Sequence, residues 1–223
     1  MENIEIGKNI DRSYYLQSDE DFAKVNQTMN YMAMFQVGEV KEYTYSDTYF
    51  ETEDLFLQNI NATVRVRRMP EYQTLSIVCN HLGQKREFEI DMDYDSQIQD
   101  KMDYVLFLED KIQDIYTHQL DVDVVRKIKS LKPFLVMTTH RKANQILTST
   151  DFRAEVDLDR TKIETKRNVD YINVVEIKNK CYLSAQNEQL FEKFVKDLER
   201  KIVLIPMGEK KLAAGMRIFK REW

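Results

Sequence analysis

Two arginines in one short segment give the first chemical signal of the sequence. Arg65 and Arg67 alternate with Val64 and Val66, so in a β-strand both guanidinium groups would lie on one face. Two neighbouring guanidinium groups need an anion. Inside a closed barrel their planar forks would suit a phosphate or a polyphosphate, because the fork binds phosphate oxygens bidentately. On an open sheet, a carboxylate of a neighbouring strand would satisfy them instead. This strand alone leaves both interpretations open.

Acidic residues alternate in the same way farther along the chain. Carboxylates occupy every second position of one segment, at Glu87, Glu89, Asp91 and Asp93. A row of acids on a strand is most often a solvated outer face, because charged side chains are mostly exposed. The alternative is that part of the row points into a barrel, where it would balance the arginines or hold a hard cation such as Mg or Mn.

Two later segments combine both signs of charge. Thr139 and Arg141 would share one face of a strand, and a following segment alternates Glu155, Asp157 and Asp159 with apolar residues. A polar interior must be satisfied by its own charges or by a ligand. These segments therefore favour a functional role for the arginines.

The elements that would position these side chains follow from hydrophobic periodicity and from capping residues. Strands are predicted at 2–16, 40–50, 62–69, 73–81, 85–93, 134–148, 152–164 and 171–181. Helices are predicted at 18–32, 53–58, about 97–130, about 184–202 and about 208–220, with Pro133 ending the third. Short strands with only 5 glycines and 3 prolines predict an α+β fold, a closed antiparallel barrel with a polar interior. A single domain over 1–223 is expected.

Composition narrows the function classes. The chain of 223 residues is 43% hydrophobic and carries a net charge of -5, which argues against a general nucleic-acid surface or an anionic-membrane surface. A polyanion would have to bind in a focused basic site. Charges in the first residues and the absence of a long apolar window predict a soluble cytoplasmic protein with no membrane segment. The two cysteines lack metal-site spacing and fit a reducing compartment. The oligomeric state stays open.

Two neighbouring motifs resemble the CYTH domain of the triphosphate tunnel metalloenzymes. They are YFETEDL at 49–55 and NATVRVR at 61–67, with weaker likenesses at KREFE (85–89) and VEI (175–177). The resemblance implies a closed eight-stranded antiparallel tunnel with flanking helices. Such a tunnel binds triphosphate through arginine and lysine, and Mg or Mn through inward carboxylates.

The resemblance also implies a role for individual residues. The implied phosphate ligands are Arg65, Arg67, Arg86 and Arg141. The implied metal ligands are Glu87, Glu89, Asp157, Asp159 and Glu176, and the implied catalytic residues are Asp11 and Glu176.

The chain departs from the family pattern at both ends. The opening E-x-E-x-K strand is represented by Asn9, Asp11 and Ser13, or by Glu2, Glu5 and Lys8 in a register that requires a β-bulge. The closing E-x-E becomes Glu176 followed by Lys178. Three hypotheses follow. The first is a metal-dependent triphosphatase acting on inorganic triphosphate, a nucleoside triphosphate or a related organic triphosphate. The second is a degenerate tunnel that binds a phosphorylated or otherwise anionic ligand, or a protein partner, without turnover. The third is a scaffold whose charges pair internally. Adenylate cyclase chemistry also occurs on this fold.

Overall fold

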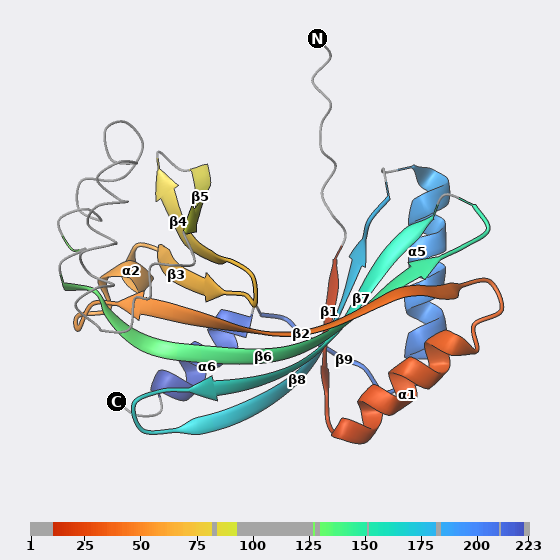
Figure 1. Ribbon diagram of the computed structural model, residues 1–223, viewed down its shortest axis with the longest axis horizontal. Coiled ribbons are helices and arrows are strands. Elements are labelled where there is room, and N and C mark those ends of the chain that lie inside the picture. The colour runs from red at the N-terminus through yellow and green to blue at the C-terminus, as the bar shows by residue number, and fades with distance from the viewer. Residues whose placement is uncertain are drawn as a thin grey trace, which may run out of the picture. The chain divides into compact units, whose positions relative to one another are not determined.

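The computed structural model of the chain describes residues 11–81, 84–92, 127, 130–150, 152–181, 184–209 and 211–220 (Figure 1). Its strands are β1 (Arg12–Leu16), β2 (Gln36–Glu51), β3 (Thr63–Arg68), β4 (Gln73–His81), β5 (Gln84–Met92), β6 (Lys132–Leu147), β7 (Arg153–Glu164), β8 (Val169–Asn179) and β9 (Ile205–Pro206). Its helices are α1 (Asp19–Asn30), α2 (Phe56–Asn59), α5 (Ala185–Glu199) and α6 (Lys211–Lys220).

The strands form one sheet in the order β5-β4-β3-β2-β6-β7-β8-β1-β9. β1 pairs antiparallel with β8 and β9, and β3 pairs antiparallel with β2 and β4. Within the residues that the structure describes, β5 and β9 are the two ends of this order, so the sheet is open there. The antiparallel sheet with flanking helices is confirmed, whereas the closed barrel is not.

Most predicted elements are present with small shifts. β4 has the predicted bounds, and β3, β5, β6, β7 and β8 differ by up to two residues at an end. Only the end of the first predicted strand is described, because residues 1–10 lie outside the described ranges, as does nearly all of the predicted helical segment at 97–130. β2 begins at Gln36, before the predicted start, and Pro133 is the second residue of β6.

The chain divides into two compact units. The first contains Met1–Tyr43, Thr139–Lys162 and Tyr171–Ala214, and the second contains Thr44–Thr138, Ile163–Asp170 and Gly215–Trp223. The long strands β2, β6, β7 and β8 each contribute residues to both units. The single domain over 1–223 stays a prediction.

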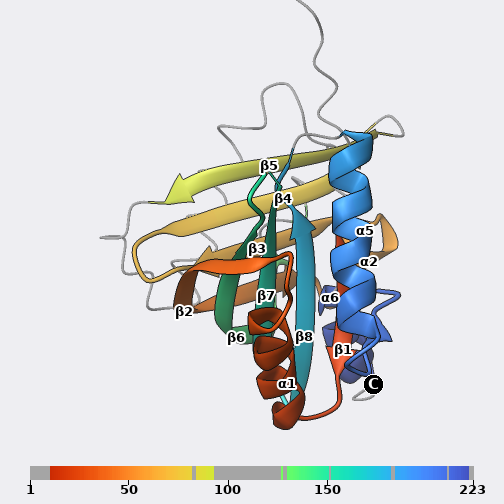
Figure 2. The ribbon, with the colours of Figure 1, turned by 90° about the vertical axis from the view of Figure 1, so that its right-hand side faces the viewer.

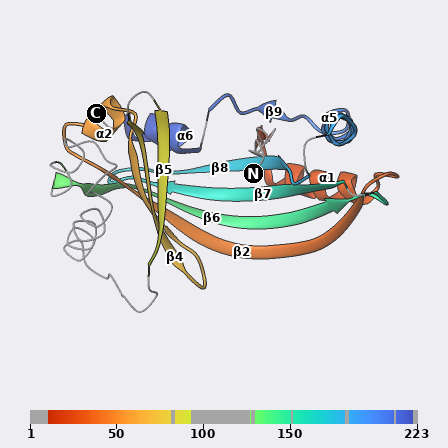
Figure 3. The same cartoon turned by 90° about the horizontal axis from the view of Figure 1, so that it is seen from above.

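The core of the first unit is formed by one face of its strands together with α1 and α5. The backbone N–H of Ser18 donates to Asp21 at 3.1 Å, which satisfies a free donor at the start of α1. The apolar sides of both helices are buried against strand residues such as Val156 and Leu158. Figures 2 and 3 show the two helices beside these strands. Because successive side chains of a strand point to opposite faces, the residues between them lie on the other face.

In the second unit, β3, β4 and β5 form an antiparallel meander (Figure 2). Val64, Val66 and Leu75 are buried on one face, so Arg65 and Arg67 lie on the other. None of the helices in the described ranges is long and apolar enough to cross a membrane.

Candidate functional site

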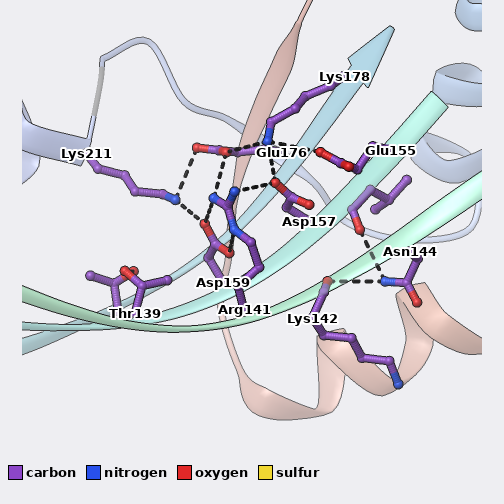
Figure 4. A network of polar contacts seen from close by, with 12 residues as sticks. Thr139, Arg141, Lys142, Asn144, Glu155, Asp157, Asp159, Glu176, Lys178 and Lys211 are labelled. Atoms are coloured by element: carbon purple, nitrogen blue, oxygen red, sulfur yellow. Dashed lines mark hydrogen bonds and ion pairs between the residues drawn. The ribbon is translucent and has the colours of Figure 1, made fainter. Parts of the chain in front are cut away.

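Three neighbouring strands carry charged side chains on the sheet face opposite α1 and α5 (Figure 4). β6 contributes one residue of this group, β7 two and β8 two, and the first residue of α6 completes it. We call these six residues the Arg141 cluster: Arg141, Asp157, Asp159, Glu176, Lys178 and Lys211. All six belong to the first unit.

Arg141 is the centre of the cluster, and only 9% of the residue is exposed. Its Nε and Nη2 donate to the two oxygens of Asp159 at 2.7 and 2.6 Å. Nη1 lies 2.6 Å from Oδ2 of Asp157, and Nη2 also donates to Oε2 of Glu176 at 3.1 Å. One guanidinium fork therefore holds three carboxylates, a geometry that a lysine cannot reproduce.

Two lysines complete the charge balance. Lys178 Nζ lies 2.5 Å from Oδ2 of Asp157, and Lys211 Nζ contacts Asp159 and lies 3.1 Å from Oε1 of Glu176. The cluster thus contains three cations and three carboxylates, and its formal charge is zero. Mixed charges at such short distances satisfy one another in the absence of a ligand.

Burial and pairing shift the pKa values of the two aspartates in opposite directions. Burial raises the pKa of Asp157, and the positive charges of Arg141 and Lys178 offset only part of this effect. Burial would also raise the pKa of Asp159, but the hydrogen bonds from Arg141 and the charge of Lys211 outweigh it, so that pKa is lowered. Asp159 is therefore the better-stabilised anion, whereas Asp157 lacks part of the compensation that a buried carboxylate needs.

The surroundings of Asp157 show whether the cluster could hold a divalent cation. Its Oδ1 is buried and has no hydrogen-bond partner in the structure. The acids of the cluster offer only oxygen donors, which suit Mg or Mn. Among the described residues, no three acid, His or Cys side chains are already arranged to hold an ion. The donor chemistry and the unpartnered oxygen fit a hard cation, although the cluster's own cations occupy most of the other carboxylate oxygens.

A second mixed-charge group lies in the second unit. Asp47 stands opposite Arg67 in the register of β2 and β3 and is 5% exposed. Arg67 Nε and Nη2 donate to its two oxygens at 2.7 and 2.8 Å, and the guanidinium lies 4.6 Å from the ring centroid of Tyr45. Burial would lower the pKa of Arg67, but Asp47 raises it. Here a cross-strand carboxylate satisfies the guanidinium, as on an open sheet.

Arg65 is less completely satisfied than Arg67. Its Nη2 donates to Ser76 Oγ at 2.9 Å, but its Nε lies 3.9 Å from Asp47 and is buried without a hydrogen-bond partner. Burial raises the pKa of the neighbouring Tyr49 to about 12, so its hydroxyl stays protonated at neutral pH. Because Asp47 is shared between two guanidinium groups, Arg65 keeps hydrogen-bonding capacity for a further acceptor.

The remaining predicted site residues lie elsewhere or outside the described part. Glu87, Glu89 and Asp91 belong to the second unit and are exposed, as expected for a solvated face. The side chain of Arg86 and all of Asp93 lie outside what the structure describes. Asp11 is exposed just before β1. Loss of hydration raises the pKa of Asp11, while Lys178 and Lys180 act in the opposite direction, so Asp11 lies within the electrostatic reach of Lys178.

The structure brings together Arg141, Asp157, Asp159 and Glu176, which the sequence indicates as site residues, and the two charged groups contain three further side chains that the sequence analysis missed. Lys178 had been noted only as a departure from the family pattern. Asp47 could have been predicted as a partner of the arginines, because it lies at an alternating position of a predicted strand that precedes the arginine strand. Lys211 had no such signal, because it enters the cluster from a helix remote in sequence from its partners.

The fold and the Arg141 cluster define a class of protein: an antiparallel sheet with flanking helices whose strands carry arginine, lysine and carboxylates on one face. Comparison with protein families agrees with this description. The model of the CYTH domain matches residues 15–208, and the chain belongs to this family. Enzymes of this family are generally dependent on divalent metal ions.

Solved structures support the fold. A protein from Hippeastrum, described as an adenylyl cyclase-like protein with a dominant triphosphatase activity, has a TM-score of 0.59 at 15% identity. The similarity covers 94% of this chain and 96% of that one. An adenylate cyclase-like protein from Bacillus halodurans has a TM-score of 0.51 at 17% identity, over 92% of this chain and 96% of the other. Identities this low show the fold alone. No curated protein sequence matches the chain.

Proposed function

We propose that this chain is a metal-dependent triphosphatase that acts on inorganic triphosphate, a nucleoside triphosphate or a related organic triphosphate at the Arg141 cluster. The observation that carries the proposal is Arg141 itself, a buried guanidinium shared among three carboxylates on one face of a CYTH sheet. In the resting protein these groups satisfy one another. A triphosphate would exchange partners with them, because its oxygens bind the same cations.

Charge balance makes metal and anion binding interdependent. The cluster is neutral, so a triphosphate that takes the cations would leave three carboxylates uncompensated, two of them completely buried, which is costly. Asp157, Asp159 and Glu176 would then hold a divalent ion, beginning at the unpartnered Oδ1 of Asp157. When bound, such an ion neutralises phosphate charge and helps to generate and orient a water nucleophile. The anion should therefore bind far more tightly together with the ion than without it.

The three cations of the cluster would bind phosphate in different ways. The planar fork of Arg141 would bind two oxygens of one phosphate, whereas Lys178 and Lys211 would act as point charges. Arg65, Arg67 and Arg86 stay predicted phosphate ligands, and Glu87 and Glu89 stay predicted metal ligands. Asp11 and Glu176 stay the predicted catalytic residues, and the closed tunnel stays the form in which these side chains would act together.

Phosphate release from tripolyphosphate and from ATP, with Mg and then with Mn, tests the proposal. Arg141→Lys keeps the charge balance but removes the fork, so kcat/KM should fall by about 10- to 100-fold. Lys142→Ala is the matched control, because Lys142 lies next in sequence, points away from the cluster in Figure 4 and pairs with Glu42 at 3.4 Å. The control should retain full activity. Absence of phosphate release with both metals would refute the hydrolase.

A second candidate function has its own observation. Lys178 places an ammonium against Asp157 and Glu155, where the family pattern has a carboxylate. This substitution favours a domain that binds a phosphorylated ligand without turnover. Calorimetric binding of tripolyphosphate in the presence of a chelator, together with no phosphate release in Mg or Mn, would establish this function instead of hydrolysis.

A further inference from the structure

A hollow of about 340 Å³ lies in the first unit, lined by residues of β2, β6 and β7 together with Lys180, which follows β8. Besides two alanines, six polar residues line it: Glu39, Lys41, Gln145, Arg153, Glu155 and Lys180. This volume lies at the lower end of the range for small-molecule pockets. The hollow therefore suits a small polar group.

Glu155 connects this hollow to the Arg141 cluster. It lines the hollow, and its Oε1 lies 3.2 Å from Lys178 Nζ and 3.4 Å from Lys180 Nζ. Lys178 in turn holds Asp157 of the cluster. Glu155 and Asp157 are two residues apart on β7, so they lie on the same face. A linear anion held in the cluster would thus reach the hollow by continuing along this face, past Glu155.

The charges of the hollow leave one cation uncompensated. Lys41 lies 3.5 Å from Glu39, and Lys180 lies 3.4 Å from Glu155. Within the described part of the chain, the guanidinium of Arg153 makes no hydrogen bond or ion pair, and the side chain is exposed. Three cations therefore face two carboxylates here, and the unpaired cation is the one whose planar fork matches phosphate oxygens.

The lining also disfavours an organic group. It contains no aromatic side chain and no large aliphatic side chain, so a nucleobase would find no surface for stacking or apolar burial. An additional phosphate would meet the free fork of Arg153 and the ammonium groups of Lys41 and Lys180. We propose that the hollow is a subsite for a further phosphate group, and that the ligand class of the chain is linear inorganic polyphosphate of four or more phosphates. This inference rests on the proposed binding of a triphosphate at the Arg141 cluster.

Calorimetry at low temperature in the presence of Mg tests the subsite, with phosphate release followed in parallel. The probes are tripolyphosphate, tetrapolyphosphate and ATP. The native protein should bind tetrapolyphosphate about tenfold more tightly than tripolyphosphate, because one exposed charge-assisted contact is added. Arg153→Ala should remove most of this advantage and leave the affinity for tripolyphosphate unchanged. It should leave folding intact, since this guanidinium holds no partner within the described part of the chain.

Arg160→Ala is the matched control. Arg160 lies on the same strand on the opposite face, over the ring of Phe22 and 3.4 Å from Asp19. The Arg160→Ala substitution removes the same charge without changing the hollow, so the ratio of the affinities for tetrapolyphosphate and tripolyphosphate should not change.

The outcomes separate this inference from the proposed function. Equal affinity for the two polyphosphates, an equal loss for both in Arg153→Ala, or tighter binding of ATP than of tetrapolyphosphate would overturn the subsite, while tripolyphosphate binding would leave the proposed function standing. Failure of the native protein to bind any of the three would overturn the proposed function itself, and the subsite with it.

Discussion

Asp159→Asn should destabilise the fold much more than Asp157→Asn, although both side chains are completely buried. Asp159 accepts two hydrogen bonds from Arg141 and contacts Lys211, so its loss leaves three cations facing two carboxylates. Breaking a buried pair of this kind costs about 3–5 kcal/mol. Asp157→Asn loses the charged contacts with Arg141 and Lys178, but relief of a buried charge whose Oδ1 has no partner offsets part of that loss, so the net cost should be about 1–2 kcal/mol.

Urea denaturation followed by circular dichroism at neutral pH measures both changes, and the m-value should stay constant. Asparagine keeps the size of aspartate, so each variant serves as the packing control for the other. If Asp157→Asn cost as much as Asp159→Asn or more, the assignment of Asp159 as the principal anion of Arg141 would be refuted.

The pH dependence of these two variants should have opposite signs. The folded pKa of Asp159 is lowered, so its contribution to stability is present above the ordinary carboxyl pKa and is lost as pH falls through the lowered value. The native protein should therefore lose its advantage over Asp159→Asn below about pH 4. The folded pKa of Asp157 is raised, so its ionisation opposes folding at higher pH. Acidification through that raised pKa should stabilise the native protein relative to Asp157→Asn.

Three further stability predictions can be checked by the same denaturation assay. Glu51→Gln should cost about 2–3 kcal/mol, because the buried carboxylate accepts backbone N–H groups of Leu57 and Gln58 at 3.0 and 2.9 Å, and an unchanged stability would contradict this role. Gly215→Ala should cost about 1–3 kcal/mol, because its Cβ would lie 2.7 Å from Leu135 Cδ2, whereas Gly208→Ala, with nothing within 4 Å, should be neutral. Ser184→Ala should cost about 1 kcal/mol, because Ser184 Oγ caps α5 by accepting the Asn187 N–H at 3.1 Å; a loss as large as that of Glu51→Gln would point to a role beyond capping.

The sequence was sufficient to predict elements that bury one face. Val64 and Val66 alternate with arginines in β3, and residues 153–159 of β7 alternate between charged and apolar side chains, so this period of two indicated the faces of both strands. Helix α1 begins after Ser18, where a capping residue indicates its start, and α5 begins after Ser184, where an amphipathic pattern starts. In each of these elements, the local sequence pattern and the packing in the folded protein favour the same conformation.

The elements that were missed lack such a pattern. Residues 36–39 of β2 precede the predicted start at 40, and all but the half-buried Val37 are exposed, so their polarity does not mark them as part of the strand. β9 is a two-residue pairing with Tyr14 and Tyr15, too short to show periodicity. The open ends of the sheet depend on which strands meet across long sequence separations, and local alternation carries no information about that pairing.

Periodicity predicted the faces of the site residues better than it predicted their partners. Arg67 was correctly placed beside Arg65, yet its anion turned out to be Asp47 on the adjacent strand. Two facing strands fix such a pair only through their register, which the sequence does not state. The partner of Asp159 was still harder to predict, because Lys211 lies 52 residues farther along the chain in a different element.

Lys178 changes the electrostatic character of the site as well as one ligand. With a carboxylate at this position, the cluster would contain two cations and four carboxylates, and its net charge would repel a polyanion until metal ions had bound. With Lys178, three cations face three carboxylates, so the net charge of the cluster repels neither the polyanion nor the metal ion, and either can bind first. Each ligand displaces the internal partners of the other. The substitution should therefore lower the metal requirement for binding while keeping the two ligands coupled, since any cation given to phosphate leaves a buried carboxylate in need of a positive charge.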